Sequence, residues 1–340
     1  MKGIYRSPPV DDRLIWDVWL TSHNLPALLA ADEIGLFDAL ADGPLSVQDA
    51  ASACKVNARA LGIVAGLLCA LGLLARRDGR LSVTVTSREY LVKSSDFYWG
   101  ALIGFFRTRL PVYDQLMEAL APDAAHKGGD NAKGWEEGKI GAEEARSIAA
   151  FMHAHSCAPA IGAARSGAFA NVKRLLDVGA GSGVFAIAAA QAFPDLRATV
   201  MDLDTMCAAA QHYIDEGEVG DRVDTAAVDM FRQPWPTGYD ALFFSNIFHD
   251  WSDETNIELA KKAFDVLPSG GRIFLHEQLM NDNLDGPATT AAFSMLMLIG
   301  TQGRQFSLPE FGAILGAAGF VDVEARATCG YYSLVEGRKP

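Results

Sequence analysis

The sequence has fewer basic than acidic residues. Its 340 residues include 29 Lys and Arg against 42 Asp and Glu, so the formal net charge is −13. A sequence-independent nucleic-acid binder needs a basic face to displace counterions, and a polybasic membrane anchor needs the same sign of charge. The charge therefore argues against both classes, and we expect neither nucleic acid nor a membrane as a partner.

Long hydrophobic runs and cysteine pairs are absent as well. The most apolar run, over residues 59–75, is bracketed by arginines and falls short of the roughly 18 residues that cross a bilayer. The N-terminus lacks a basic region followed by an apolar stretch, so we expect no signal peptide. The 5 cysteines are scattered and form no C-x-x-C pair. We therefore expect free thiols in a reducing cytoplasm and no metal site.

The first part of the chain has a helical pattern. Half of all residues are hydrophobic, and before residue 95 they recur at helical spacing, as over 14–19, 25–40 and 58–74. Ser46 precedes Asp49 by three positions, which is typical of a helix start. A short hairpin with an Asp78-Gly79 turn follows. We expect a winged-helix-like domain over residues 1–95.

Residues 96–165 are expected to form a helical linker and a lid over a substrate pocket. The segment 97–120 is aromatic and apolar, whereas 122–142 is polar and rich in glycine. Residues 143–165 have a helical pattern and carry Met152 and His153, so this helix is a candidate cover for the pocket.

Short apolar runs alternate with helix-length segments from residue 172 onward. This alternation is typical of parallel strands joined by helices. The predicted strands cover 174–178, 198–201, 223–228, 241–245 and 272–276, and a closing hairpin covers 320–328 and 331–336. We therefore predict an α/β, Rossmann-like domain over 166–340, with a mostly parallel sheet and a C-terminal antiparallel hairpin.

A glycine-rich turn follows the first of these strands. Asp177 precedes Gly179, Gly181 and Gly183, and an apolar helix begins directly afterwards. Glycine suits such a turn because a Cβ would block the tight bend and the close approach of a ligand. A dinucleotide site usually has the spacing G-x-G-x-x-G for a pyrophosphate, whereas the spacing here is G-x-G-x-G beside an acid. S-adenosylmethionine (SAM) has an ammonium instead of a phosphate, so the pattern favours SAM.

The next two strands also end in acids. A carboxylate at Asp202, which Leu203 follows, would accept hydrogen bonds from both ribose hydroxyls of a nucleoside. Asp229 would take the adenine amino group, and Met230 would pack on the ring. These three acids favour a SAM site over an ordinary tight turn. A NAD-dependent dehydrogenase remains an alternative, which stabilisation by S-adenosylhomocysteine but not by NAD would exclude.

The candidate catalytic residues follow the last two parallel strands. His249 lies just past a strand end, where ligands bind in open α/β sheets, and a neutral imidazole can remove a proton from a hydroxyl. Glu277 ends the neighbouring strand on the same edge. It would hold the imidazole in the useful tautomer and stabilise its protonated form.

These motifs together resemble the plant-type small-molecule O-methyltransferase family, which includes caffeate and acetylserotonin O-methyltransferases and bacterial relatives. The segment from His249 to Glu254 is its most specific part, and the resemblance covers nearly the whole chain. It implies that His249 is the general base, that Glu277 brackets it and that SAM is converted to S-adenosylhomocysteine. It also implies an intertwined homodimer with residues 1–95 as dimerisation domain, a substrate pocket and a position near the adenine. The residues implied for the substrate pocket are Met152, His153, Phe293 and Met297. The residue implied near the adenine is Ser245.

Two departures from the family pattern leave alternatives open. Ser245 stands where some relatives have a cation, and Gln305 replaces a second acid that flanks the histidine. A thioether acceptor needs no base, so S-methylation of 4-methylthio-2-hydroxybutyrate toward dimethylsulfoniopropionate is a second hypothesis. The carboxylate of this thioether acceptor would need an arginine to bind it with two parallel hydrogen bonds. The candidates are Arg107, Arg109 and Arg304.

A transcription regulator is a third and weaker hypothesis, since winged helices bind DNA. Arg76, Arg77 and Arg80 form the one local basic cluster near the hairpin.

Overall fold

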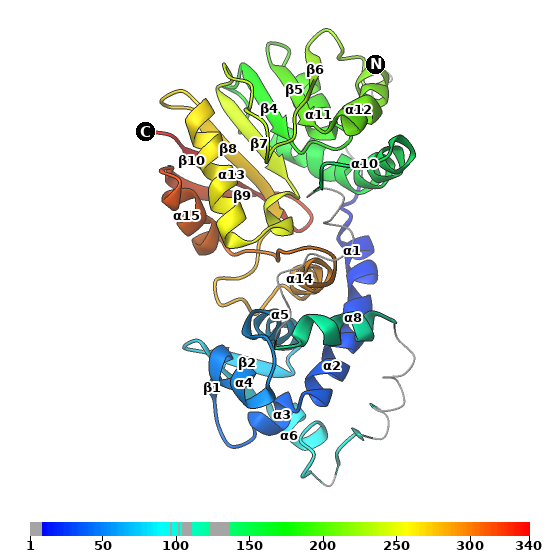
Figure 1. The fold of residues 1–340 in the computed structure, drawn as a ribbon, viewed down its shortest axis with the longest axis vertical. Coiled ribbons are helices and arrows are strands. Elements are labelled where there is room, and N and C mark those ends of the chain that lie inside the picture. The colour runs from blue at the N-terminus through cyan, green and yellow to red at the C-terminus, as the bar shows by residue number, and fades with distance from the viewer. Residues whose placement is uncertain (1–8, 96, 101–102, 104–110, 123–136) are drawn as a thin grey trace. The chain divides into compact units, whose positions relative to one another are not determined.

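The computed structural model describes residues 9–95, 97–100, 103, 111–122 and 137–340 (Figure 1). The chain divides into two compact units that are each discontinuous in sequence. The first contains residues 1–13, 133–279 and 308–340, and the second contains residues 14–132 and 280–307. This division differs from the continuous segments 1–95, 96–165 and 166–340 expected from the sequence.

A seven-stranded sheet forms the centre of the first unit, in the order β6-β5-β4-β7-β8-β10-β9. Its first five strands are parallel, whereas β10 runs antiparallel to both β8 and β9. The strands are β4 (Arg174–Val178), β5 (Arg197–Asp202), β6 (Val223–Ala227), β7 (Ala241–Ser245), β8 (Arg272–Gln278), β9 (Val321–Cys329) and β10 (Tyr332–Arg338). The predicted fold class is confirmed, including the antiparallel hairpin at the end of the chain.

Helices cover both faces of this sheet, which explains the continuous apolar runs of its central strands. Helices α10 (Ala142–Arg165), α11 (Val184–Ala192) and α12 (Asp204–Glu216) pack together on one face. Helices α13 (Asp253–Val266) and α15 (Leu308–Ala317) pack on the other (Figure 1). A buried aromatic cluster of Phe169, Phe185, Phe243 and Phe274 joins α11 to the sheet.

The second unit is mainly helical and contains a three-stranded sheet of order β1-β3-β2. The Ser46 hydroxyl accepts a hydrogen bond from the Asp49 amide at 3.1 Å and so caps α4. Asp78 and Gly79 both have positive φ, as a tight hairpin turn requires. The elements of the second unit are α1 (Arg13–Leu20), a short 3-10 helix η1 (Thr21–His23), α2 (Asn24–Glu33), α3 (Leu36–Ala39), β1 (Leu45–Ser46), α4 (Val47–Cys54), α5 (Ala58–Ala70), β2 (Leu74–Arg77), β3 (Arg80–Val83), α6 (Val85–Tyr90), α8 (Pro111–Leu120) and α14 (Ala288–Gly300).

Helix α14 belongs to the second unit because it packs on α5 and α8. The predicted segment 97–120 lies partly, and the predicted loop over 122–142 mostly, outside the described residues. Across the described chain no single helix is long and apolar enough to cross a membrane. The helices α4 and α5 pass that test only as a pair, with a bend of 110° between them.

Candidate active site

The glycine turn after β4 requires its glycines. Gly179, Gly181 and Gly183 have φ values of 65°, 57° and 73°, which L-residues with a Cβ rarely adopt. A Cβ on Gly179 would lie 2.5 Å from the Cδ1 of Ile247, and one on Gly183 would lie 2.9 Å from the Cγ2 of Val200. The turn therefore brings bare backbone to the carboxyl ends of the strands.

Two buried carboxylates lie beside this turn. Asp202 accepts hydrogen bonds from the amides of Gly181 at 2.9 Å and Leu203 at 2.8 Å. Asp177 accepts one from the amide of Ala186 at 3.2 Å. Burial raises the pKa of Asp202 to about 6 and that of Asp177 to about 8, where the charge of Asp202 adds to the effect. A cationic or hydroxylated ligand would compensate the cost of charging these groups.

Asp229 follows β6 and has a different environment. Its Oδ2 lies 2.6 Å from the guanidinium of Arg232, and its Oδ1 accepts hydrogen bonds from the amides of Phe231 and Arg232. Partial burial raises the pKa of Asp229, but these hydrogen bonds outweigh it and lower the pKa overall. Arg232 is therefore a neighbour that the sequence pattern did not indicate.

One cavity open to solvent collects most of the predicted cofactor residues. Its empty space, counted together with the solvent at its mouth, is about 970 Å³. Gly183 is the one predicted cofactor residue that does not line it. The predicted residues that do are Asp177, Gly179, Gly181, Asp202, Leu203, Asp229, Met230, Ser245 and Met152.

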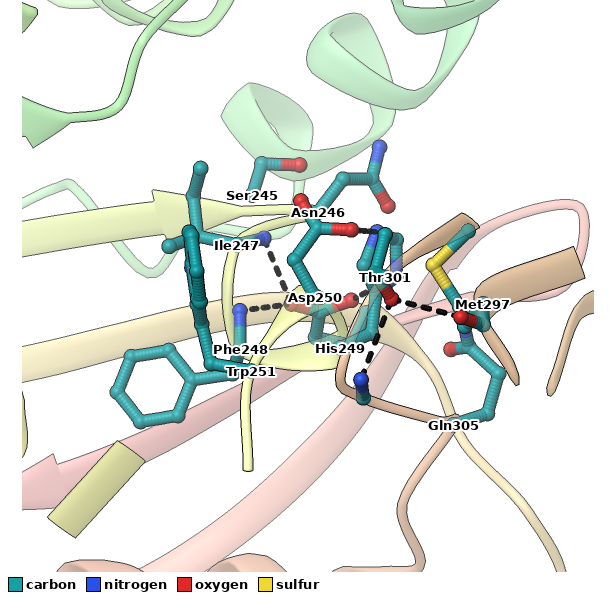
Figure 2. Close-up of polar contacts among 12 residues, drawn as sticks. Ser245, Asn246, Ile247, Phe248, His249, Asp250, Trp251, Met297, Thr301 and Gln305 are labelled. Carbon is teal, nitrogen blue, oxygen red and sulfur yellow. Dashed lines mark hydrogen bonds and ion pairs between the residues drawn. The ribbon is translucent and has the colours of Figure 1, made fainter. Parts of the chain in front are cut away.

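His249 and Glu277 form a buried pair next to this cavity. His249 lies on a short 3-10 helix, η2 (Phe248–Asp250) (Figure 2). Its Nδ1 is 3.1 Å from the Oε2 of Glu277. The two side chains are 5% and 1% exposed. The other oxygen, Oε1 of Glu277, accepts hydrogen bonds from the amides of Ile247 at 3.2 Å and Phe248 at 3.1 Å. Glu277 is thus fixed by the same turn that carries His249.

The residues next to His249 face the cavity and were missed by the sequence analysis. Asp250 Oδ1 lies 3.7 Å from His249 Nε2. Burial raises the pKa of Asp250 to about 6, with His249 opposing the shift and Glu277 adding to it. Asp250, Trp251, Ile247 and Asn246 all line the cavity. Asp250 and Trp251 belong to the family segment His249–Glu254, whereas the sequence signal for Asn246 and Ile247 is adjacency to His249.

Helix α10 carries three residues in or near the site: Met152, His153 and His155. Met152 lines the cavity, whereas His153 does not. The Nδ1 of His153 lies 3.3 Å from the hydroxyl of Ser182 in the glycine turn, and its ring stacks on Tyr213 at 4.1 Å. Burial, followed by the charge of His249, lowers the pKa of His155 to about 4.

The remaining predicted substrate residues lie on α14 in the second unit. Phe293 and Met297 are 5% and 7% exposed, and Phe293 packs on Trp16 at 5.4 Å. The Thr301 hydroxyl donates to the Met297 carbonyl at 2.9 Å (Figure 2). Gln305 is buried in the same unit, and its amide donates to the hydroxyl of Ser294. The candidates Arg107 and Arg109 lie outside the described residues.

The residues of the cavity fit an adenosyl sulfonium ligand. Buried carboxylates accept the hydrogen bonds of an ammonium and of ribose hydroxyls, and the glycine turn leaves room for a close backbone approach. Among the described residues no group of three or more His, Cys, Asp or Glu side chains is arranged to hold a metal ion. The fold and this donor set define the class of SAM-dependent methyltransferases.

Comparisons with known proteins identify the family. The O-methyltransferase domain profile matches residues 124–321. The chain is 35% identical over 313 residues to the 3-hydroxy-5-methyl-1-naphthoate 3-O-methyltransferase of Streptomyces sahachiroi, covering 91% of this chain and 90% of the relative. The chain belongs to the O-methyltransferase family and is a SAM-dependent O-methyltransferase acting on small molecules.

Solved structures agree with this assignment. An O-methyltransferase family 2 protein from Planctomyces limnophilus, in complex with apigenin, superposes with a TM-score of 0.88 at 28% identity, covering 100% of this chain and 99% of the other. Human N-acetylserotonin methyltransferase, solved in complex with SAM, has the same fold, with a TM-score of 0.60 at 22% identity, covering 98% and 99%. The family resemblance predicted from the sequence is therefore confirmed.

Proposed function

We propose that this enzyme methylates a hydroxyl group on an aromatic small molecule, with His249 as general base and Glu277 as the carboxylate that positions it. The observation that carries the proposal is the buried contact of 3.1 Å between His249 Nδ1 and Glu277 Oε2. A hydroxyl must lose its proton as it attacks a methyl group, whereas a thioether has no proton to lose. A buried, oriented imidazole has a use in the first reaction and none in the second.

The paired nitrogens of His249 would have separate tasks. A carboxylate at Nδ1 holds that nitrogen protonated, so Nε2 keeps its lone pair for the acceptor proton. The Nε2 atom lies 3.7 Å from Asp250, a residue of the cavity wall, which supports an acceptor hydroxyl bound nearby. Glu277 then stabilises the imidazolium that forms.

SAM, when bound, supplies the activated methyl group. We propose that Asp177 accepts hydrogen bonds from its ammonium, that Asp202 accepts them from its ribose hydroxyls and that Asp229 accepts one from its adenine amino group. Met230 would pack on the adenine ring, while the remaining residues shape the wall. Those remaining wall residues are Gly179, Gly181, Leu203 and Ser245, while Gly183 belongs to the glycine turn without lining the cavity.

The acceptor is proposed to be a planar aromatic compound. This chain resembles a naphthoate O-methyltransferase and a family protein that was solved with apigenin. We propose Met152, Phe293 and Met297 as substrate residues, because apolar and sulfur-containing side chains suit aromatic rings. The contacts of His153 support a role in holding Ser182 of the glycine turn.

We also propose that the enzyme is a homodimer. Leu14, Ile15 and Val18 form one face of α1 and are 71%, 70% and 69% exposed. Such clustered apolar exposure is typical of a surface that another chain covers. Sedimentation of the protein should give a dimer, and Leu14→Glu with Val18→Glu should shift it to a monomer.

An acceptor panel tests the proposed function. It contains 3-hydroxy-1-naphthoate, apigenin and N-acetylserotonin as hydroxyl acceptors and 4-methylthio-2-hydroxybutyrate as thioether. We expect turnover of at least one hydroxyl acceptor and a loss of about 10²- to 10⁴-fold in kcat for His249→Ala. Turnover of the thioether alone, unchanged by His249→Ala, would establish S-methylation and refute the base role.

A further inference from the structure

The turn between β7 and His249 contains a residue in an unusual conformation. Asn246 has φ of 55°, in the left-handed region that most side chains avoid. Asn tolerates this region better than most residues, because its short polar side chain forms local hydrogen bonds. Asn246 also lines the cavity, between the end of β7 and η2.

A tyrosine from the far end of the chain holds this asparagine. The hydroxyl of Tyr332 donates to Asn246 Oδ1 at 3.1 Å, across 86 positions of sequence. Tyr332 is 1% exposed, and its ring stacks on the buried His276 at 4.9 Å with an interplanar angle of 3°. Because the ring is fixed on β10, the hydroxyl presents a fixed donor to the turn.

The backbone of the same turn is held at consecutive positions. The amide of Asn246 donates to the carbonyl of His276 at 3.3 Å. The next two amides, of Ile247 and Phe248, donate to Glu277 Oε1. The side chain of Asn246 is thus the anchor of the turn on β10, while the following amides anchor it on β8.

We propose that Tyr332 and Asn246 are positioning residues for methyl transfer: their hydrogen bond fixes the 246–248 turn and thereby the imidazole of His249. This role rests on the proposed function of His249 as base. The backbone direction at Asn246 determines where the next three residues lie, and the pair contributes no group to the chemistry itself. Loss of the bond should therefore lower kcat and leave the affinity for SAM nearly unchanged.

A double-mutant cycle tests the pair. Tyr332→Phe keeps the ring and removes the hydroxyl, while Asn246→Gly keeps the left-handed conformation accessible and removes the acceptor. We measure kcat and the KM for SAM with the best hydroxyl acceptor of the panel above. Each single variant should lose roughly tenfold in kcat, with the KM for SAM changed less than about twofold. The double variant should lose no more than the larger of the two single losses, because both substitutions remove the same hydrogen bond.

Tyr239→Phe is the matched control. Tyr239 is also buried and donates its hydroxyl at 3.0 Å to Thr199, in a part of the first unit away from the cavity. The Tyr239→Phe variant should lose thermal stability, as Tyr332→Phe does, but its kcat should remain that of the wild type. Multiplicative losses in the double variant, or a kcat within twofold of wild type for Tyr332→Phe, would overturn the inference. If His249→Ala retains full activity in the same series, the base role has failed independently of the cycle.

Discussion

Two parts of the same sheet edge use buried carboxylates in opposite ways. At the ends of β4 and β5, Asp177 and Asp202 accept hydrogen bonds from backbone amides and are costly to ionise. At the ends of β7 and β8, Oε1 of Glu277 accepts hydrogen bonds from two amides, and Oε2 lies 3.1 Å from Nδ1 of His249. Asp177 and Asp202 can accept further hydrogen bonds from a ligand. The pair of Glu277 and His249, in contrast, is formed without a ligand.

This difference indicates which variants change binding and which change the chemical step. Carboxylates that need a partner should affect affinity for SAM, because the ligand completes their hydrogen bonds. The carboxylate that already has its partners should affect kcat, because it acts through the imidazole.

The largest effect is expected for His249→Ala. Removal of the base should lower kcat for a hydroxyl acceptor by about 10²- to 10⁴-fold and leave the Kd for SAM within a few-fold. His212→Ala is the control, since that side chain is 67% exposed and lies next to Glu216 on the surface. Steady-state kinetics together with calorimetric SAM binding would separate the two effects. Equal losses in kcat and in SAM affinity would contradict the separation of a SAM-binding group of residues from a catalytic group.

Glu277→Gln should lower kcat by roughly 10²-fold, a smaller effect. The amide oxygen still accepts from the turn, but the amide nitrogen would donate to His249 Nδ1 and favour the wrong tautomer. Glu336→Gln is the matched control, because Glu336 is another partly buried acid of the sheet, paired with Arg272 and Arg326. The measurement is kcat alongside the thermal midpoint. A kcat near wild type in a folded Glu277→Gln protein would show that the carboxylate does not set the tautomer.

Much of this edge could be predicted from the sequence because its signals are local. The strands at 174–178 and 241–245 have the predicted bounds, and the acids and glycines follow them directly. β8 extends to Gln278, two residues beyond its predicted end, because its last residues pair with β10. The last two residues, Glu277 and Gln278, are polar, so the sequence did not indicate that the strand continues there with buried side chains.

Contacts between distant segments could not be predicted. Asn246 and Tyr332 are 86 positions apart, and no local pattern links them. The pairing of Asp229 with Arg232 depends on the course of a loop. The grouping of α14 with the N-terminal helices depends on packing against α5, which the strand–helix alternation around it does not indicate.

Asp202→Asn should weaken SAM binding by roughly tenfold and change kcat at saturating SAM by less than threefold. The amide accepts hydrogen bonds at one atom instead of two, so the ribose loses a partner. Asp195→Asn serves as control, since its carboxylate is 87% exposed. Calorimetric Kd values give the comparison. A fall in kcat with unchanged affinity would place Asp202 in the chemical step and contradict its assigned role.

The smallest effect is a dependence of SAM affinity on pH. With the pKa of Asp202 raised to about 6 and that of Asp177 to about 8, both groups bind protons in the free protein that the ligand displaces. SAM should bind more weakly as pH falls through about 8 and again through about 6, and its binding at pH 7 should release protons. Calorimetry in buffers of different ionisation enthalpy would count them, and no release would contradict the raised pKa values.

The same shifts have a consequence for the stability of the free protein. A carboxyl whose pKa is raised in the folded state adds stability at low pH, which is lost as pH rises through the folded pKa. For Asp202 this loss lies between the unfolded value near 4 and about 6. SAM should therefore raise the thermal midpoint more at pH 8 than at pH 5, and Asp202→Asn should reduce that difference.

The proton-removing role of His249 has its most direct test in the acidity of the acceptor. Wild-type enzyme and His249→Ala would be compared in single turnovers on a series of hydroxynaphthoates that differ in hydroxyl pKa, including a nitro-substituted one that is ionised at neutral pH. An acceptor that is already ionised needs no base, so His249→Ala should approach wild-type rates with it and fall far behind with the least acidic acceptor. An equal loss across the whole series would show that His249 does not remove the proton.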